Sequence, residues 1–294
     1  MPSLGRVLTA MATPMQPDRS IDFDGVQRLA THLVDHGNDG IVVCGTTGES
    51  PTLSHAETLD MFRAVVDAVG DRATVVAGCG KNDTAATVEL TREATALGVD
   101  AIMLVTPYYN KPSQRGLANH FTLAAQATDL PVMLYNIPSR SAVEIAPETL
   151  LDLATGVPNI TAVKDAVVDF TKTAWFAARK PSDFEIFSGD DATFLPLLSV
   201  GGAGVVSVAA HLVGDDIAQM VEVFATDPRK AQEIHLRLLP LFTGLFGDTS
   251  PAPLKAGLRM LGLPAGPVRP PLADADERTA TVMREALHAA GVAL

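Results

Sequence analysis

The sequence predicts an α/β protein, a (β/α)8 TIM barrel with a C-terminal helical extension, on three observations. Eight short runs rich in apolar and β-branched residues recur along the chain, each as continuous as a strand buried on both faces requires. Amphipathic segments separate them, and the 294-residue chain is long enough for one large barrel. An open doubly wound sheet is the alternative, because periodicity alone does not reveal closure. The runs cover residues 7–14, 40–49, 73–80, 101–109, 131–138, 160–166, 184–191 and 202–210.

The segments between these runs carry the capping residues of helices. In the segment 54–70, Ser54 is a predicted N-cap, and Glu57 three residues later completes a capping box. The segments 22–37 and 83–98 each open on an aspartate and end in a glycine. Strands and helices that alternate in this way indicate repeated βα units and a parallel sheet.

Further helices are predicted after the eighth run. We divide the chain into a (β/α)8 barrel catalytic domain over residues 1–225 and a C-terminal helical region over residues 226–294. No linker, low-complexity tract or break in composition separates the two. The helices are predicted within residues 217–225, 230–246, 253–262 and 277–291.

Composition and charge exclude several classes of function. The chain has 22 Lys and Arg against 34 Asp and Glu, a net charge of −12, and no basic patch, so nucleic acid is not an expected partner. The first apolar run is too short for a signal peptide, and no run reaches the roughly 20 residues of a membrane span. We expect a cytoplasmic protein that has no membrane partner.

Neither the cysteines nor the histidines are spaced as metal ligands. Cys44 and Cys79 lie in strand-like runs, and we expect both to be small buried hydrophobic residues in a reducing compartment. The seven histidines form no HxH or HExxH pattern. The glycine-rich run 201–204 is a weak candidate for a phosphate cradle, because no helix start with suitable glycine spacing follows it. The sequence therefore predicts no metal and no cofactor.

Polar side chains gather where the predicted strands end. Barrel enzymes place their active sites at this carboxyl-terminal edge. Hydroxyls, tyrosines, one arginine and one amine would therefore meet at a common mouth. The strand ends read Gly45-Thr46-Thr47-Gly48-Glu49, Pro107-Tyr108-Tyr109-Asn110, Tyr135-Asn136-Ile137-Pro138-Ser139-Arg140, Lys164-Asp165, Ser188-Gly189-Asp190 and Val206-Ser207.

Lys164 is the candidate nucleophile. Inside a barrel its amine would be desolvated, and a pKa lowered to about 7–8 permits attack on a carbonyl and formation of a Schiff base. The alternative is an ion pair with Asp165, but consecutive strand residues point to opposite faces, which makes that pair geometrically poor. Tyr135 lies one strand away and would transfer protons; its alternative is a core tyrosine with a satisfied hydroxyl.

Two other strand ends offer groups that suit a carboxylate. Thr46 and Thr47 lie between glycines, where hydroxyls and backbone amides hold an anion or relay a proton. Their alternative is an N-cap for the helix that follows. Arg140 follows a proline turn and offers a bidentate fork for a carboxylate; its alternative is an ordinary surface arginine.

These strand ends belong to longer motifs that run along nearly the whole chain. The motifs are TAMATP, GTTGESPTLS, VTPYYNKPSQRGLANHF, YNIPSRS, AVKDA, SGDDA, GGAGVVSV and PAPLKAGLRMLG. Together they resemble the dihydrodipicolinate synthase (4-hydroxy-tetrahydrodipicolinate synthase) family, in the N-acetylneuraminate lyase superfamily of pyruvate-dependent class I aldolases. GTTGE, the tandem tyrosines, and YNxPxR with a lysine on the next strand form a specific set, although none suffices singly.

The resemblance implies roles for the proton-transfer groups. Lys164 would form a Schiff base with pyruvate, and Tyr135 would donate and accept protons. Thr46 and Tyr109 would complete the relay, with the tyrosine contributed across a tight dimer interface. Members of the family are usually homotetramers built as dimers of dimers, which is the assembly we expect.

The resemblance also implies how two substrates are held. Thr47 and the backbone at Val206 would hold the carboxylate of pyruvate, and Arg140, near Gly189, would receive the carboxylate of L-aspartate 4-semialdehyde. The implied activity is that of a lyase in lysine and diaminopimelate biosynthesis. It needs no cofactor beyond the covalent Schiff base on Lys164.

Two other functions remain as alternatives. One is a related pyruvate-dependent aldolase acting on a sugar-derived keto acid, but such relatives typically lack an arginine at the position of Arg140. The other is a non-catalytic barrel that binds a keto acid, against which retention of both Lys164 and Tyr135 argues. The chain also departs from the commoner Lys-Glu-Ala motif, having Asp165 after the lysine, and has Thr249-Ser250-Pro251-Ala252-Pro253 in place of an Asn-Pro element.

The resemblance further implies a degenerate allosteric site for L-lysine. Two positions that are often His and Glu in lysine-inhibited members are Thr58 and Ala86 here. An effector ammonium without a carboxylate loses a charge-assisted bond worth about 1.5–3 kcal/mol. We therefore expect weak or absent inhibition by L-lysine. The positions that match the allosteric site and keep its polar character are Ser50, His55, Asn82 and Tyr108.

Overall fold

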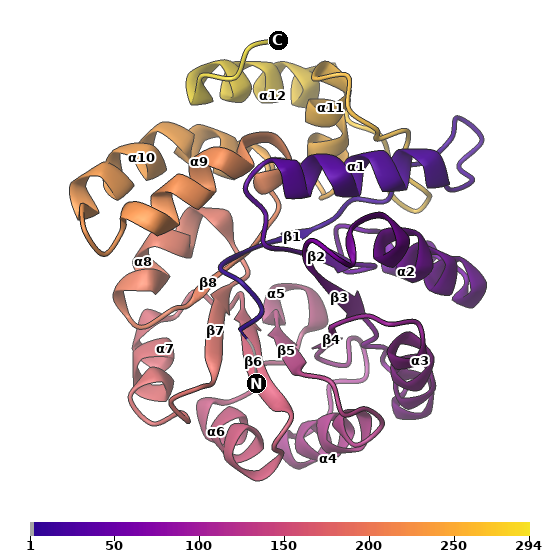
Figure 1. Ribbon diagram of the computed structural model, residues 1–294, viewed down its shortest axis with the longest axis vertical. Helices are drawn as coiled ribbons and strands as arrows, with labels where there is room; N and C mark the ends of the chain where they lie inside the picture. Colours follow the sequence, from indigo (N-terminus) through magenta and orange to yellow (C-terminus); the bar gives the residue numbers. More distant parts are fainter. Residues whose placement is uncertain (1–2) are drawn as a thin grey trace. The chain divides into compact units, whose positions relative to one another are not determined.

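Eight parallel strands form the closed barrel that the sequence predicts. The computed structural model describes residues 3–294, and its strands follow one another around the barrel in chain order (Figure 1). This order is that of a closed barrel and not that of an open doubly wound sheet. The strands are β1 (Val7–Ala10), β2 (Gly40–Val43), β3 (Thr74–Gly78), β4 (Ala101–Val105), β5 (Val132–Asn136), β6 (Ile160–Asp165), β7 (Glu185–Ser188) and β8 (Gly204–Ser207).

Helical segments follow every strand. Those inside the βα repeat are α1 (Phe23–Asp35), η1 (Ser50–Thr52), α2 (His55–Val69), α3 (Thr84–Ala96), α4 (Gln114–Ala125), α5 (Pro138–Ser141), α6 (Pro147–Gly156), α7 (Phe170–Ala177), η2 (Asp191–Thr193) and α8 (Phe194–Ser199). Those after β8 are α9 (Ala210–Val223), α10 (Pro228–Gly244), α11 (Ala252–Met260) and α12 (Glu277–Ala290). The four helices predicted at the C-terminal end are thus present.

Local sequence signals explain where the helices begin. Ser54 caps α2, accepting a bond from the backbone amide of Glu57, whose side chain accepts one from the amide of Ser54, so the predicted capping box is confirmed. Asp22 is the N-cap of α1, and Asp24 lies in its first turn, where a negative charge favours the positive end of the helix dipole.

The strands are shorter than the runs that predicted them, because each run continues into a loop. The run 40–49 is the clearest case: β2 ends at Val43, and Cys44 turns the chain with a φ of +55°. Cys44 and Cys79 are both buried, as expected of small hydrophobic residues. The glycine-rich run 201–204 leads into strand β8 and not into a helix, so it lacks the helix start that a phosphate cradle uses.

The chain divides into two compact units. One unit consists of Val76–Val206 with the residues up to Gly5, and its core is built from strand residues such as Leu104, Leu134 and Val163, all fully or almost fully buried. In its sheet, β4 pairs with β5, β5 with β6, β6 with β7, and β7 with β8. This unit carries the strand ends of Tyr135 and Lys164.

The second unit consists of Arg6–Val75 and Ser207–Leu294. Helix α10 packs against α9 and α12, burying Leu238 and Phe242 on one helix and Met283 and Leu287 on α12. This unit carries the GTTGE loop. Within residues 3–294, no helix combines the length and the apolar character needed to cross a bilayer.

Candidate active site

Lys164 and Tyr135 face each other on neighbouring strands of the first unit. The two residues are register partners of β6 and β5, and the Nζ atom of Lys164 lies 4.1 Å from the centroid of the Tyr135 ring. Each residue is only 4% exposed. The structure thus places the amine of Lys164 against an aromatic face in a desolvated setting.

The electrostatic surroundings of Lys164 favour its neutral form. Burial lowers the pKa of Lys164 to about 7, because a buried ammonium loses its hydration. The negative charge of Asp191 opposes this shift, and the positive charge of Arg140 adds to it. About half of a primary amine with this pKa is neutral at pH 7 and so available as a nucleophile.

Asp165 points away from its neighbour Lys164 and makes other contacts. Its Oδ1 accepts a hydrogen bond from the amide of Val167 at 3.1 Å, and its Oδ2 accepts one from Thr173 Oγ1 at 3.1 Å. Burial raises the pKa of this carboxyl. The alternation of strand side chains therefore separates the two groups, as the sequence predicts.

Several hydrogen bonds fix the segment that carries Arg140. Thr106 Oγ1 donates to Ser141 Oγ at 2.8 Å, next to the arginine. The side chain of Asn136 accepts from the amide of Ile145 at 2.9 Å and donates to its carbonyl at 3.3 Å. Arg140 itself is exposed, so it offers its guanidinium at the surface of this unit.

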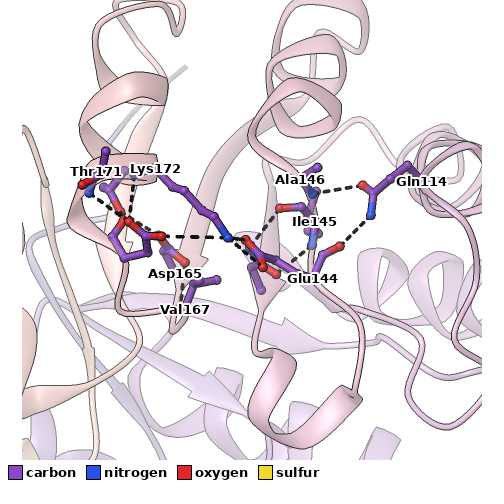
Figure 2. Close-up of polar contacts among 11 residues, drawn as sticks. Gln114, Glu144, Ile145, Ala146, Asp165, Val167, Thr171 and Lys172 are labelled. Atoms are coloured by element: carbon purple, nitrogen blue, oxygen red, sulfur yellow. Dashed lines mark hydrogen bonds and ion pairs between the residues drawn. The ribbon is translucent and has the colours of Figure 1, made fainter.

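Figure 2 shows hydrogen bonds and an ion pair that join the residues after Arg140 to neighbouring helices. Gln114 of α4 donates to the carbonyl of Glu144 at 2.8 Å and accepts from the amide of Ala146 at 3.0 Å. Lys172 of α7 forms an ion pair with both carboxylate oxygens of Glu144, at 2.8 and 3.0 Å. Two helices therefore hold the residues that follow Arg140.

Gly189 directly follows β7, and Val206 is the next-to-last residue of β8. A Cβ atom on Gly189 would lie 2.8 Å from the Cβ of Ala166 and 3.3 Å from Cε of Lys164, so only glycine leaves room beside the lysine side chain. Its amide donates to the carbonyl of Asp165 at 2.8 Å. Val206 is buried in β8.

Thr46 and Thr47 lie in a tight loop of the second unit. The loop is bounded by Cys44, with a φ of +55°, and Glu49, with a φ of +58°, and Thr47 is buried while Thr46 is half-buried. Gly48 fits because an added Cβ would lie only 3.1 Å from the carbonyl oxygen of Met11. The hydroxyls of Thr46 and Thr47 therefore lie on a tightly turned loop whose backbone conformation is set at both ends.

The tandem tyrosines differ in exposure. Tyr109 has a φ of +73° and is 89% exposed, whereas Tyr108 is half-buried. Asn110 connects their loop to the carbonyl of Asn82 through its side chain, at 2.7 Å, and its amide donates to the carbonyl of Tyr108 at 2.9 Å. Of the other residues assigned to a degenerate allosteric site, Ser50 is half-buried and His55 exposed, and both belong to the second unit.

Comparison with known proteins identifies the family. The model of the Dihydrodipicolinate synthetase family matches residues 3–290. The chain belongs to this family. A relative from Symbiobacterium thermophilum, named 4-hydroxy-tetrahydrodipicolinate synthase, is 50% identical over 293 residues, covering 99% of this chain and 100% of the relative.

Solved structures of dihydrodipicolinate synthases agree with this assignment. One from Cyanidioschyzon merolae, with lysine bound, is 44% identical, covers 99% of each chain and has a TM-score of 0.97. Another, from Bacillus anthracis, is 43% identical, covers 98% of this chain and 99% of that chain, and has a TM-score of 0.95. The family predicted from the motifs and the barrel fold predicted from the alternating strand and helix segments are therefore both confirmed.

Some residues that shape the site of this dihydrodipicolinate synthetase family member were missed at the sequence level. Asp191 is buried and its charge acts on Lys164, yet only its membership of the SGDDA motif marked it. Thr106 and Ser141 hold the arginine segment, but isolated hydroxyl residues carry no sequence signal of their pairing. Among residues 3–294, no group of three or more His, Cys, Asp or Glu side chains is arranged to hold a metal ion.

Proposed function

We propose that this chain is a 4-hydroxy-tetrahydrodipicolinate synthase, which condenses pyruvate with L-aspartate 4-semialdehyde in lysine and diaminopimelate biosynthesis, in the cytoplasm. The observation that carries the proposal is the amine of Lys164, buried, with its pKa lowered to about 7, and 4.1 Å from the ring of Tyr135. A class I aldolase needs such an amine. Relatives about 50% identical over the whole chain carry the same name.

The first half of the reaction uses the neutral amine. Lys164 attacks the keto carbon of pyruvate, and the carbinolamine loses water to give the protonated imine. Loss of a proton from the methyl group then yields the enamine. Tyr135 donates and accepts the protons of these steps, since its side chain lies beside the amine. Thr46 relays protons to it, and Thr47 with the backbone at Val206 holds the pyruvate carboxylate.

The second half forms the ring. The enamine carbon attacks the aldehyde carbon of L-aspartate 4-semialdehyde, and the new carbon–carbon bond leaves an alcohol. The amino group of the second substrate then adds to the imine carbon and expels Lys164, which is regenerated as the ring closes. Arg140 receives the carboxylate of the second substrate near Gly189, for which its planar guanidinium is suited.

The exposure of Tyr109 supports an assembly of several copies. A tyrosine that is 89% exposed on a residue with φ of +73° is held outward from its own chain. We propose that it completes the proton relay of a neighbouring copy in a homotetramer built as a dimer of dimers. Burial of this ring against a second copy would also remove a large apolar surface from water.

Trapping the imine tests the proposed function. The protein is incubated with pyruvate, reduced with borohydride, digested and examined by mass spectrometry. The expected result is an adduct on Lys164 and none on Lys180, a half-buried lysine of the same unit whose amine donates to the carbonyl of Phe184 at 2.6 Å. Lys164→Ala is the matched control and loses the adduct.

Turnover with the second substrate completes the test. We expect L-aspartate 4-semialdehyde to be consumed with pyruvate, and sugar aldehydes to be poor substrates because Arg140 is a partner for a carboxylate. An adduct on another lysine, or full activity in Lys164→Ala, contradicts the mechanism. Preference for a sugar aldehyde contradicts the assignment of the substrate.

A further inference from the structure

Two fully buried charged side chains form an ion pair in the unit that carries the GTTGE loop. Nζ of Lys255, on α11, donates to Oε1 of Glu49 at 2.6 Å, and both side chains have 0% exposure. The two residues are 206 positions apart in the chain. No step of the proposed mechanism uses either group.

The remaining bonds of this pair lead to the segment that follows α11. Lys255 Nζ also donates to the carbonyl of Pro267 at 2.8 Å, and the amide of Arg269 donates to Oε2 of Glu49 at 2.8 Å. The guanidinium of Arg269 donates to both carboxylate oxygens of Glu57, at 3.0 and 2.6 Å. The end of the GTTGE loop is therefore hydrogen-bonded to the segment around Pro267 and Arg269, which an ion pair with Glu57 stabilises in turn.

Stability is a poor explanation for such a pair. Removing two charges from water has a large cost that mutual attraction often fails to exceed, and apolar residues of similar volume frequently replace buried pairs without loss. Burial lowers the pKa of Lys255, and the charge of Glu49 opposes that shift. The better-attested use of buried polar groups is to select one geometry among several.

The loop next to this pair has an unfavourable backbone conformation that other contacts must stabilise. Cys44 and Glu49 both lie in the left-handed region, which is unfavourable for residues other than glycine. The amide of Glu49 donates to the carbonyl of Thr46 at 3.1 Å, and Thr13 Oγ1 donates to the carbonyl of Gly48 at 2.7 Å. Thr46 and Thr47 lie between the two left-handed residues, so their positions depend on both ends of the loop.

We infer that the Glu49–Lys255 ion pair is a positioning device that fixes the loop bearing Thr46 and Thr47. The inference rests on the proposed function, which assigns those hydroxyls to the proton relay and the pyruvate carboxylate. Glu49 accepts from both donors while its backbone is left-handed, and these bonds to a distant segment would hold the loop in that state. Without the pair the loop relaxes, and the two threonines move while Lys164 keeps its own surroundings.

The test compares variants that break the pair with variants that do not. Lys255→Met removes the counter-charge, Glu49→Gln/Lys255→Met leaves a neutral pair of similar volume, and Glu57→Gln weakens the same C-terminal segment without touching the loop. We expect Lys255→Met to raise the KM for pyruvate about tenfold or more and to slow borohydride trapping at Lys164. The double variant regains thermal stability but keeps the raised KM. Glu57→Gln lowers the Tm and leaves kcat and KM unchanged.

The possible outcomes separate a positioning role from a structural one. Wild-type KM and trapping rate in either folded variant, within about twofold, would overturn the inference, since a change in Tm alone is a structural effect. Recovery of KM together with Tm in the double variant would also overturn it, because volume and not charge would then be sufficient. If the wild-type protein itself traps no pyruvate at Lys164, the proposed function fails instead.

Hydrogen exchange on the wild-type protein supplies a measurement that needs no variant to fold. We expect the amides of residues 45–50 to open together with those of α11, at the same rate and with the same dependence on denaturant. Independent and faster opening of residues 45–50 would show that the pair does not hold the loop, and the inference would be wrong.

Discussion

Two buried lysines, one in each unit, have opposite surroundings. Lys164 is 4% exposed and Lys255 is 0% exposed, and burial lowers the pKa of both. Lys255 is matched by a carboxylate at 2.6 Å, whereas Lys164 lies over the ring of Tyr135. Desolvation is common to the two. Lys255 has a carboxylate in hydrogen-bond contact, whereas the charge of Asp191 only partly offsets the effect of burial on Lys164.

The difference shows how one residue type serves two purposes. The carboxylate of Glu49 opposes the effect of burial on Lys255 and holds its amine in one place by a hydrogen bond. The buried amine of Lys164, beside an aromatic ring and near the positive charge of Arg140, gives up its proton near pH 7, as the nucleophile that we propose would. The predictions below test this contrast.

The largest effect is expected when each lysine loses its amine. Lys164→Ala should lower kcat/KM at least about 10³-fold, because the nucleophile is gone. It should lower the free energy of unfolding less than Lys255→Met does, because burial disfavours the ammonium of Lys164 despite the opposing charge of Asp191. Lys255→Met should lower that free energy by about 3–5 kcal/mol, because the carboxylate of Glu49 is left buried and unpaired. Steady-state kinetics and urea unfolding of both variants provide the measurements; equal losses of stability would contradict the contrast.

Removing the tyrosine hydroxyl should have the next largest effect. Tyr135→Phe keeps the ring over the Nζ atom of Lys164 and removes the proton donor. We expect kcat to fall about 10²- to 10⁴-fold, the usual size of a general acid–base contribution. Tyr108→Phe is a matched control at a half-buried tyrosine outside the proposed proton relay, and it should keep kcat. Stopped-flow measurement of imine formation would detect the loss, and an unchanged rate would exclude Tyr135 from proton transfer.

The pH dependence should follow Lys164, whose pKa is lowered to about 7 by burial. The pKa of Lys164 falls from 10.5 to about 7 on folding, so its amine gains a proton and ceases to attack as pH drops through 7. We expect kcat/KM for pyruvate to fall about tenfold per pH unit well below that value. The folded state binds this proton less tightly than the unfolded state does. Burial of Lys164 therefore lowers the free energy of unfolding, by nothing above pH 10.5 and by its full amount below about pH 7. A flat profile between pH 6 and 8 would contradict the assignment.

The smallest effect concerns free L-lysine, whose ammonium group also needs a counter-charge. Thr58 and Ala86 offer no carboxylate, and Thr58 Oγ1 already donates to the carbonyl of Ser54 at 2.9 Å. We expect L-lysine at about 1 mM to inhibit the enzyme less than about twofold, because a site that lacks this carboxylate should bind L-lysine only weakly, with a Kd of about 1 mM or more. An Ala86→Glu variant should become more sensitive. Strong inhibition of the wild-type protein at that concentration would show that other groups bind the ammonium.

The sequence predicts the barrel well because its signals are local. Continuous apolar runs mark strands buried on both faces, and the capping box of Ser54 and Glu57 marks the start of a helix. The alternation of side chains along β6 also separates Lys164 from Asp165, as the structure shows. In each case the information lies within a few residues.

The missed parts of the site depend on contacts across long stretches of chain. Glu49 and Lys255 are 206 residues apart, and Thr106 pairs with Ser141 across 35 residues. No periodicity or short spacing in the sequence indicates that the members of either pair are in contact. Asp191 acts through its charge, and the field of a charge at a lysine depends on distances that only the folded chain defines.

The ion pair between Lys172 and Glu144 makes one part of the first unit sensitive to salt. Both side chains are partly exposed, at 44% and 30%, so dissolved ions screen their attraction within a Debye length of about 8–10 Å. The pair holds the residues just after Arg140, while Lys164 is buried and shielded from the same ions. Dissolved salt therefore weakens an attachment of the segment that carries Arg140 more than it alters the surroundings of Lys164.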